Sequence, residues 1–457
     1  MNPSVTNFLP PQTLVTSPRI IRQATSTSSA LPPKKKAFYR LLRHPMAMPY
    51  NRLAISVVII NITVAVILGQ LGFDSIPLAT FMNVILANFA VAILIRQQYV
   101  INALFKVATS VPLSWPLSIR WACGKVYHFG GVHVGGFFSA TLWFAYYLGR
   151  LTTMAAQTKP AGATWMAWVH LPLLVSMIIM ALPTIRARYH NYFEMVARFG
   201  SWLSLLLFWY QTVAFSQFGP SGRWTSLILA PQFWVLSLIT FSIALPWLRL
   251  RRVSVNLARP SSHATLAHFD YGVTPFAGSS TELSRNPLLE WHSFANVPTP
   301  GQEGFRLTIS RAGDWTGRLI DEQPEKLWVK GIPTAGVGNI ETIFKKVIWV
   351  ATGSGIGPCL PHLFANRVPS RLVWSTKNPQ RTYGDSLVAE ITAAQPNAVI
   401  WDTDNRGKPD LVALAYQAYR DLGAEAIICI ANKKVTWQVC QEFESRGIPA
   451  FGAIWDS

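Results

Sequence analysis

The sequence predicts a membrane protein with two parts: a bundle of six transmembrane helices, then a small antiparallel β-barrel and a doubly wound α/β domain built on a parallel sheet. Three observations lead to this fold class. Half of the 457 residues are hydrophobic and only 13% are charged, whereas about 25% of an ordinary soluble protein is charged. The hydrophobic residues collect in six long runs before residue 253. After it, short apolar runs alternate with turns that contain Gly and Pro.

The N-terminal segment, residues 1–45, is predicted to be a disordered basic tail. Residues 1–33 are rich in Ser, Thr and Pro and show no apolar periodicity, a composition that does not bury a core. They also lack the apolar stretch of a cleaved signal peptide. A basic stretch begins at Lys34.

The apolar runs predict a transmembrane domain over residues 46–252. Each run is close to the roughly 20 residues that cross about 30 Å of hydrocarbon. Buried core helices are the alternative, but so many runs with almost no internal charge argue against it. The runs lie at residues 53–72, 76–95, 129–149, 164–184, 201–218 and 229–247.

The charges between the runs predict an orientation. With the N-terminus in the cytosol, the outer loops hold Arg150, Lys159 and Arg223, and the many other flanking Lys and Arg lie inside. The positive-inside rule therefore predicts that both termini are cytosolic, and we expect the plasma membrane as the location. Because basic loops suit anionic lipid, membrane lipid rather than nucleic acid explains much of the net charge of +19.

Residues 343–457 are predicted to form a nucleotide-binding α/β domain. The apolar run 347–350 is typical of a buried parallel strand, and it enters a Gly-rich turn followed by a helical stretch. This arrangement points free N–H groups and a helix dipole at a phosphate; an ordinary strand–helix turn is the alternative. The residues expected to hold a dinucleotide pyrophosphate are Gly353, Ser354, Gly355, Ile356, Gly357 and Pro358.

A second strand-like run, 371–374, supports this interpretation. It is followed by Thr376 and Lys377, roughly 20 residues after the glycines, where such folds meet the adenosine ribose. An acidic residue there favours NADH, whereas these two side chains favour the 2′-phosphate of NADPH; NADH remains the alternative. Further runs at 398–401 and 426–430 complete the predicted parallel sheet.

Residues 253–342 are predicted to form the small antiparallel barrel. Short strand-like runs at 290–295 and 305–309 are separated by Gly and Pro turns. His292 and Ser293 offer hydrogen bonds to a ligand, although a surface strand residue is the alternative for His292.

The order of these pieces resembles the ferredoxin-reductase superfamily joined to a membrane domain, as in ferric reductases and NADPH oxidases. It resembles in particular the fungal transmembrane flavoprotein TmpA family. The segments that carry the resemblance are His292-Ser293-Phe294-Ala295, Gly313–Thr316, Gly353–Pro358, Trp374–Pro379, Arg406–Asp410 and Ser445–Ser457. The resemblance implies FAD held by His292, Ser293, Phe294 and Arg311, with Arg406 at the nicotinamide nucleotide. It also implies a link to conidiation signalling and to adenylate-forming proteins.

Two catalytic residues are implied by the same resemblance. Trp455 would cover the flavin, as terminal aromatic residues do in the superfamily; a core Trp is the alternative. Cys429 stands where the superfamily has Cys-Gly-Pro near the nicotinamide, although the two residues that follow it here differ from that motif. The FAD motif also departs, with Ser293 and Ala295 where Pro and Thr are usual. The segment 331–336 is a candidate for the FAD pyrophosphate.

No metal site is predicted. The four cysteines, Cys123, Cys359, Cys429 and Cys440, show no CxxC spacing. Two stacked haems require pairs of His about 20 Å apart along two helices, and the spacing of the histidines near the apolar runs does not supply them. These are His128, His133, His170 and His190. With two stacked haems excluded, the alternative that stays open is one inner haem between His133 and His190. Without an outer haem, no electron path crosses the bilayer.

The sequence therefore predicts a membrane FAD-dependent oxidoreductase that passes electrons from NAD(P)H through flavin to a small-molecule acceptor. A non-catalytic membrane sensor of redox state or nucleotide is one alternative, and a haem-containing reductase is another. A transporter is disfavoured because the runs hold few charges and no paired broken helices. Replacing Gly355 with a bulky residue is expected to abolish NADPH binding.

Overall fold

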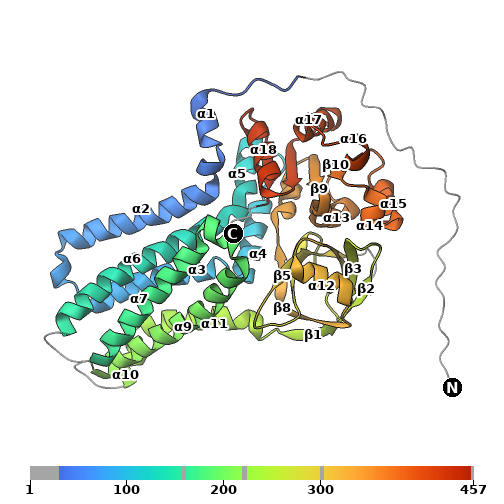
Figure 1. The fold of residues 1–457 in the computed structure, drawn as a ribbon. Helices are drawn as coiled ribbons and strands as arrows, with labels where there is room; N and C mark the ends of the chain where they lie inside the picture. The colour runs from blue at the N-terminus through green and yellow to red at the C-terminus, as the bar shows by residue number, and fades with distance from the viewer. Residues whose placement is uncertain (1–29, 156–160, 219–223, 299–302, 454–457) are drawn as a thin grey trace, which may run out of the picture.

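The computed structural model describes residues 30–155, 161–218, 224–298 and 303–453. Figure 1 shows a long helical body joined at one end to a module that contains all of the described strands. The helices of the body and its N-terminal segment are α1 (Ala37–Leu42), η1 (Pro45–Ala47), α2 (Pro49–Gln70), η2 (Phe73–Ser75), α3 (Leu78–Leu94), α4 (Gln98–Thr109), α5 (Leu117–Cys123), η3 (Gly124–Phe129), α6 (Gly130–Ala155), α7 (Ala161–Ala181), α8 (Pro183–Arg188), α9 (His190–Phe218), α10 (Trp224–Leu229) and α11 (Pro231–Trp247).

Each of the six apolar runs contains or overlaps a helix, but the prediction of six membrane spans is not supported by length and composition. Within the described residues, two helices are long and apolar enough to cross a membrane: Pro49–Gln70 and Thr164–Ala181. A third span exists if α3 and α4, bent by 69° at their break, count as one. The other helices are shorter or richer in glycine, aromatic and polar residues, which lowers their hydropathy although they pack in the same body.

Close backbone contacts hold the helical body together. A Cβ atom at Gly135 would lie 2.6 Å from the carbonyl oxygen of Ala54 on α2, and one at Gly136 would lie 2.9 Å from that of Asn88 on α3. Helix α6 therefore approaches both neighbours along a stripe of small residues, as membrane helices often do. Asn61 and Asn88 exchange two amide hydrogen bonds of 2.8 Å, and Trp143 donates to Asn61 at 2.9 Å.

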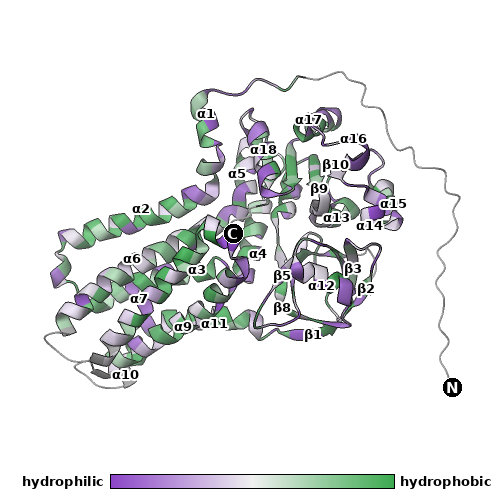
Figure 2. Cartoon of the chain, viewed as in Figure 1, coloured by the Kyte–Doolittle hydropathy of each residue, from purple (hydrophilic) through white to green (hydrophobic). Residues whose placement is uncertain are grey.

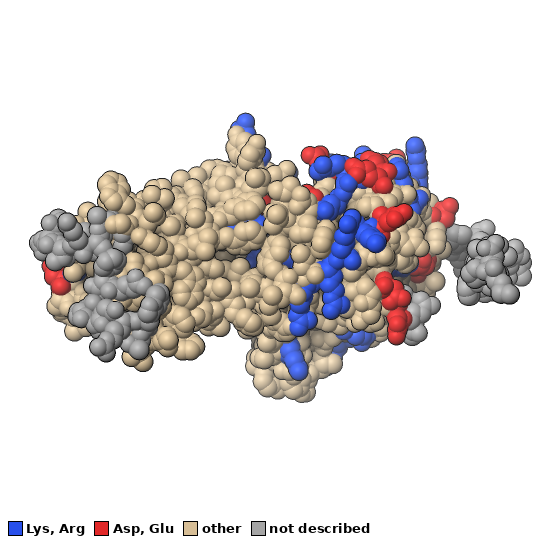
Figure 3. All heavy atoms as spheres, turned by 90° about the horizontal axis from the view of Figure 1, so that it is seen from below, with Lys and Arg blue, Asp and Glu red and all other residues tan. Residues whose placement is uncertain are grey.

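A basic connection of the helical body lies next to the module. The α4–α5–η3 connection lies beside the module, where α4 packs against β8. On the face shown in Figure 3, Lys and Arg gather over the module and its junction with the helical body, whereas the body is almost free of charge. In Figure 2 the long helices are mainly hydrophobic over most of their length. The basic α4–α5–η3 connection thus lies at the module end, and the orientation in a membrane stays a prediction.

The first part of the module is the predicted antiparallel barrel, built from two four-stranded sheets. Their strand orders are β1-β8-β4-β5 and β2-β3-β7-β6, and all of their pairings are antiparallel. Helix α12 (Asp314–Glu322) packs its apolar face on the barrel core. The strands are β1 (Arg251–Ser254), β2 (Asn256–Ala258), β3 (Ala264–Phe269), β4 (Ser279–Ser284), β5 (His292–Ala295), β6 (Val297–Pro298), β7 (Phe305–Ser310) and β8 (Lys326–Ala335).

The second part is the predicted doubly wound domain. Its five strands are all parallel in the order β11-β10-β9-β12-β13. Successive residues of β9 face opposite layers: Trp349 packs towards α13 and α15, and Val350 packs towards α17 and α18. The elements are η4 (Val337–Ile343), β9 (Val347–Thr352), η5 (Gly353–Gly355), α13 (Ile356–Ala365), β10 (Ser370–Thr376), α14 (Pro379–Tyr383), α15 (Asp385–Ala394), β11 (Val399–Asp402), α16 (Thr403–Arg406), α17 (Leu411–Leu422), β12 (Ala426–Ile430), α18 (Lys433–Glu444) and β13 (Ala450–Gly452).

This strand order has a functional consequence. The chain starts in the middle of the sheet at β9, winds out to β11, and then returns to β12 and β13 on the other side. In open α/β sheets, ligands bind outside the carboxyl ends of the strands at the point where the winding reverses. The sheet therefore directs attention to the carboxyl ends of β9, β10 and β12.

Candidate functional site

A cleft of about 860 Å³ lies at the carboxyl ends of the parallel strands, within the range of small-molecule sites. Its wall is formed by the segments that follow β9, β10, β11 and β12, and by two residues of the barrel, Ser262 and His263. A site between two domains in this position suits a nucleotide that bridges them.

The Gly-rich turn contributes one wall of the cleft. Gly353 lines it and has a φ of 48°, a backbone conformation that glycine adopts without strain. Its carbonyl oxygen accepts a hydrogen bond from Trp374 Nε1 at 3.1 Å, which fixes the turn against β10. The peptide at Gly353 is thereby held at the cleft surface.

The rest of the predicted pyrophosphate loop packs inward. A Cβ atom at Gly355 would overlap the carbonyl oxygen of Ile430, and one at Gly357 would lie 3.2 Å from that of Thr308 on the barrel. Gly355, Ile356 and Gly357 therefore bring the turn against β12 and β7. The structure places these three residues, and the exposed Ser354 and Pro358, outside the cleft lining.

The segment after β10 brings the predicted 2′-phosphate residues to the same cleft. Thr376 is buried at its floor, and Lys377 is exposed at its rim. The turn that follows is set by Asn378, whose side chain caps α14 by accepting from the Arg381 N–H at 3.1 Å. Lys377, Arg381 and Lys408 give the rim three cations.

The acidic residues of the cleft lining, Asp404 and Asp410, are fewer than its cations. Asp410 caps α17 by accepting from the Ala413 N–H at 3.0 Å, so one of its oxygens is engaged. Asp404 lines the same cleft and is exposed. The rim as a whole therefore favours an anionic ligand.

Three predicted residues lie elsewhere or outside the described chain. The guanidinium of Arg406 lies over the ring of Trp401, 5.1 Å from its centroid, and does not line the cleft. Cys429 is fully buried in the layer between the sheet and helices α17 and α18, and burial raises the pKa of its thiol well above the usual value. The structure thus gives Cys429 a packing position in the core, outside the cleft lining. Trp455 lies outside the described residues.

The predicted FAD residues of the barrel are partly brought together. The ring of His292 lies 4.3 Å from that of Trp315, and Phe294 stacks on the same indole at 5.8 Å. Within the described residues, Nε2 of His292 is buried without a hydrogen-bond partner. Burial, helped by His190, lowers the pKa of His292 to about 4, so this imidazole is neutral near pH 7. An aromatic platform with one free buried nitrogen suits a flavin or an adenine ring.

The remaining FAD residues are less suited. Ser293 is exposed on β5. Arg311 donates to both carboxylate oxygens of Asp321, at 2.6 and 3.0 Å, and to the carbonyl oxygen of Ser262 at 3.0 Å. Its guanidinium is therefore engaged within the barrel, and its contact with FAD stays a prediction.

The segment 331–336 is occupied by the helical body. Gln98 on α4 accepts from the N–H of Ile332 at 2.9 Å. Asn102, one turn further, accepts from the N–H of Ala335 at 2.8 Å and donates to the carbonyl oxygen of Pro333 at 3.0 Å. The backbone groups that would meet an FAD pyrophosphate here serve to dock the barrel on the helices.

The histidines of the helical body contact protein groups. His133 Nδ1 lies 2.8 Å from the carbonyl oxygen of Ala92. His170 is fully buried, with its ring 4.8 Å from Phe144 and 4.4 Å from Phe208. In the ranges that the structure describes, no group of three metal-ligating side chains is found.

Two cleft residues were missed in the sequence. Arg381 and Lys408 line the opening beside Lys377. Arg381 could have been found from the capping pattern Asn378-Pro379, which begins a helical turn at the end of β10. Lys408 sits inside the segment Arg406–Asp410, where the resemblance pointed to Arg406 instead.

Comparison with known proteins points to one group. Residues 337–457 match a family described as "Adenylate-forming reductase 03009, C-terminal domain". The chain is 42% identical over 424 residues to Adenylate-forming reductase 03009 of Coprinopsis cinerea, covering 92% of this chain and 41% of that protein. Adenylate-forming reductase 06235 of the same fungus is 41% identical over 424 residues, with the same coverage. The chain thus spans about two fifths of the length of the curated relatives it matches.

Solved structures show weaker likeness. Flavohemoglobin from Malassezia yamatoensis aligns with 83% of this chain and 96% of its own, at 12% identity and a TM-score of 0.39. Ferredoxin-NADP+ reductase from Plasmodium falciparum covers 45% of this chain and 95% of its own, at 11% identity and a TM-score of 0.35. Phthalate dioxygenase reductase covers 45% of this chain and 67% of its own, at 16% identity and a TM-score of 0.35.

Proposed function

We propose that this chain is the electron-transferring part of a membrane-associated reductase, which binds NADPH in preference to NADH, uses FAD, and reduces a small-molecule acceptor. The observation that carries the proposal is the cleft at the reversal point of the parallel sheet, with Gly353 in its wall and a rim of Lys377, Arg381 and Lys408. The aromatic platform of the barrel adds support for a second, planar cofactor.

The residues divide the work between the two cofactors. The exposed cations of the rim pair with the 2′-phosphate, because ionised donors form the stronger hydrogen bonds to phosphate. Gly353 lets the dinucleotide approach the backbone closely. His292 and Phe294 would hold FAD, which when bound supplies the group that accepts a hydride and releases electrons. A neutral His292 donates or accepts one hydrogen bond without adding charge to that site.

Membrane association rests on the helical body. We propose that the six helices of the apolar runs, α2, α3, α6, α7, α9 and α11, lie in the bilayer. Both described ends of the chain would then lie on the module side, and the location would be the plasma membrane. Two helices with the length and composition of spans, the charge-poor body and the exposed aliphatic side chains of α2 support this. A role in conidiation signalling belongs to the same proposal, through the resemblance to the TmpA family alone.

The acceptor class is proposed from the names of the relatives. These names join adenylate formation to reduction, so a carboxylic acid activated as an acyl adenylate is a suitable acceptor. Transfer of one hydride equivalent would break the acyl carbon–oxygen bond to phosphate and yield an aldehyde, AMP and NADP+. Ferricyanide provides an acceptor that does not depend on this choice.

The test uses the full chain purified in detergent and supplied with FAD. We expect NADPH to bleach the flavin absorption without oxygen, and to reduce ferricyanide on turnover. Lys377→Ala should raise the KM for NADPH by about tenfold or more and leave that for NADH unchanged, since a charged hydrogen bond contributes about 1.5–3 kcal/mol. Lys326→Ala, on the exposed end of β8, is the matched control. If FAD binds but NADPH is not turned over, the proposal of a reductase is wrong, and the alternative of a non-catalytic membrane sensor is favoured.

A further inference from the structure

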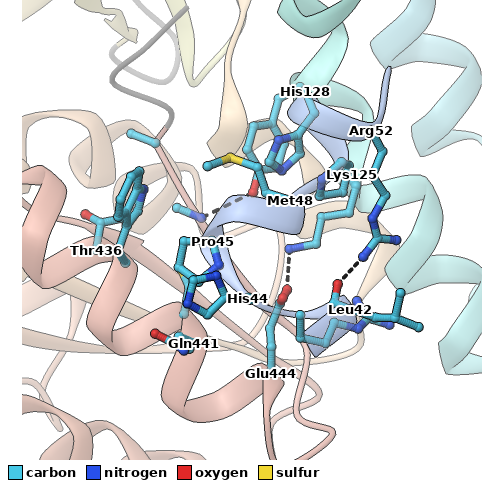
Figure 4. A pocket seen from close by; sticks show the side chains of 17 residues that line it. Leu42, His44, Pro45, Met48, Arg52, Lys125, His128, Thr436, Gln441 and Glu444 are labelled. Carbon is cyan, nitrogen blue, oxygen red and sulfur yellow. Dashed lines mark hydrogen bonds and ion pairs between the residues drawn. The ribbon is translucent and has the colours of Figure 1, made fainter. Parts of the chain in front are cut away.

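A second pocket lies at the junction between the helical body and the α/β domain. We call it the junction pocket. It is walled by the N-terminal segment that leads into α2, by η3, and by α18 with the end of β13. Figure 4 shows side chains from these elements surrounding one space. The residues on which the argument depends are Arg43, Arg52, Lys125, His128 and Glu444.

His128 is the unexplained group of this pocket. The residue is only 5% exposed, and it lines the junction pocket. In the described part of the chain, neither of its ring nitrogens has a hydrogen-bond partner. A buried polar group without a partner costs free energy and calls for a specific explanation. A ligand that hydrogen-bonds to the imidazole supplies that explanation.

The charges around the pocket define the ligand. Lys125 is neutralised by Glu444 and also donates to the carbonyl oxygen of Ala450 at 2.7 Å. Arg52 donates to the backbone carbonyl oxygens of Ala47 and Leu42. Its guanidinium has no carboxylate partner among the described residues, so its positive charge is uncompensated.

Arg43 adds a second uncompensated charge. Its guanidinium carbon lies 3.9 Å from the ring centroid of Trp121, and in the described ranges it also lacks a carboxylate. Helix α2 begins at Pro49, another residue of the lining, and the start of a helix carries partial positive charge. The pocket thus combines two guanidinium groups that lack a carboxylate partner among the described residues, a helix start and a neutral imidazole donor, which together suit a phosphate.

We propose that the junction pocket binds a phosphate group, with His128 donating one N–H to it and Arg52 and Arg43 balancing its charge. The position at the start of α2, whose side chains Ile55, Ile59 and Ile60 are more than half exposed, makes an anionic phospholipid headgroup the expected source. The assignment of the phosphate to a lipid headgroup rests on the proposed membrane insertion. The binding of a phosphate group in this pocket does not depend on the proposed redox function.

The state of His128 offers a direct readout. Burial, and next the charge of Lys125, lower the pKa of this imidazole to about 2. The charged and titratable groups around it are Arg43 and His44 of the N-terminal segment, Arg52 of α2, Tyr127 and Lys125 of η3, and Cys440 and Glu444 of α18. A bound anion offsets the positive charge, so ligand binding should raise the pKa of His128.

The experiment measures binding to the full chain in detergent by isothermal titration calorimetry. The probes are dioctanoyl phosphatidic acid, dioctanoyl phosphatidylcholine and inorganic phosphate. We expect phosphatidic acid to bind about tenfold or more tightly than phosphatidylcholine, and His128→Phe and Arg52→Gln each to weaken it by about tenfold or more, since hydrogen bonds to charged groups contribute about 1.5–3 kcal/mol. Arg188→Gln, at an exposed arginine of α8, is the matched control and should bind like the unmodified chain.

The outcomes separate the alternatives. If inorganic phosphate binds as tightly as phosphatidic acid and both respond to the variants, the phosphate site stands and its source is soluble. Equal binding of both lipids, or binding that His128→Phe and Arg52→Gln leave unchanged, would overturn the site. A circular-dichroism melting curve like that of the unmodified chain shows that a variant is folded, and if His128→Phe fails this check, Arg43→Gln takes its place. Ring-nitrogen NMR of His128 near pH 7 should show a shift of the donating N–H when phosphatidic acid is added; unchanged ring-nitrogen resonances would count against contact.

Discussion

Arg120 provides the sharpest test of how the helical body is joined to the α/β domain. It lies on α5 with only 3% of its surface exposed. Its guanidinium donates to both carboxylate oxygens of Glu425, at 2.7 and 3.1 Å, and to the carbonyl oxygen of Ile343 at 2.8 Å. One side chain thus connects the helical body to the start of β12 and the end of η4.

The cost of Arg120→Met can be worked from these contacts. Removing one partner of a buried ion pair costs about 3–5 kcal/mol because the other charge stays behind. Glu425 is partly exposed and keeps the N–H of Lys345 at 2.8 Å, so the lower end applies. We therefore expect the free energy of unfolding to fall by about 3 kcal/mol. Glu425→Gln leaves the more deeply buried charge of Arg120 without its counter-ion, whereas the amide oxygen can keep one hydrogen bond to the guanidinium, so we expect a cost of similar size.

The assay is chemical unfolding of the full chain in detergent, with the two single variants and the double variant. If the two side chains interact, the loss of unfolding free energy in the double variant should differ from the sum of the two single losses by about 1 kcal/mol or more. Additive effects would refute the argument, since they would mean that the two side chains do not interact.

The pH dependence of the same pair gives a second readout. Hydrogen bonding from Arg120 lowers the pKa of Glu425 below its usual value. A carboxylate with a lowered pKa in the folded state stabilises the protein above its unfolded pKa, near 4.3, and this stability is lost as the pH falls through the folded pKa. The stability difference between the unmodified chain and Glu425→Gln should therefore shrink below about pH 4.

Three further predictions concern the candidate site. Gly355→Ala should abolish NADPH binding together with the folded sheet, because its Cβ overlaps the carbonyl oxygen of Ile430; melting followed by circular dichroism would show both losses, and a stable variant that merely fails to bind would contradict the packing role. Cys429→Ala should leave NADPH turnover within about twofold and cost about 1 kcal/mol of stability, since the thiol lies in the core; a loss of turnover at full stability would restore a catalytic role. His292→Asn should flatten the fall in stability between about pH 6.5 and 4, because protonating the buried imidazole, with its pKa of about 4, opposes folding; an unchanged pH profile would show that His292 is not desolvated.

Several features could be predicted from the sequence because they depend on local patterns. Alternation and apolar runs predicted the parallel sheet from 343 onward and the antiparallel strands before it, since strand burial leaves its mark on neighbouring residues. The spacing from the glycines to Thr376 and Lys377 placed these residues at the cleft, because a βαβ unit has a nearly constant length. The six helices were located for the same reason, although their length and composition support two spans, with a third only if the bent α3–α4 pair counts as one.

The rest was decided by tertiary contacts between residues far apart in the chain. Nothing in the local sequence shows that Arg311 is engaged by Asp321, that Gln98 and Asn102 occupy the 331–336 segment, or that Cys429 faces the core instead of the cleft. The packing of α2 against η3 places Arg52 and His128 in the lining of one junction pocket. A residue type establishes what chemistry is available, but only the folded chain decides which partner satisfies it, because burial and hydrogen bonding depend on neighbours that sequence distance does not reveal.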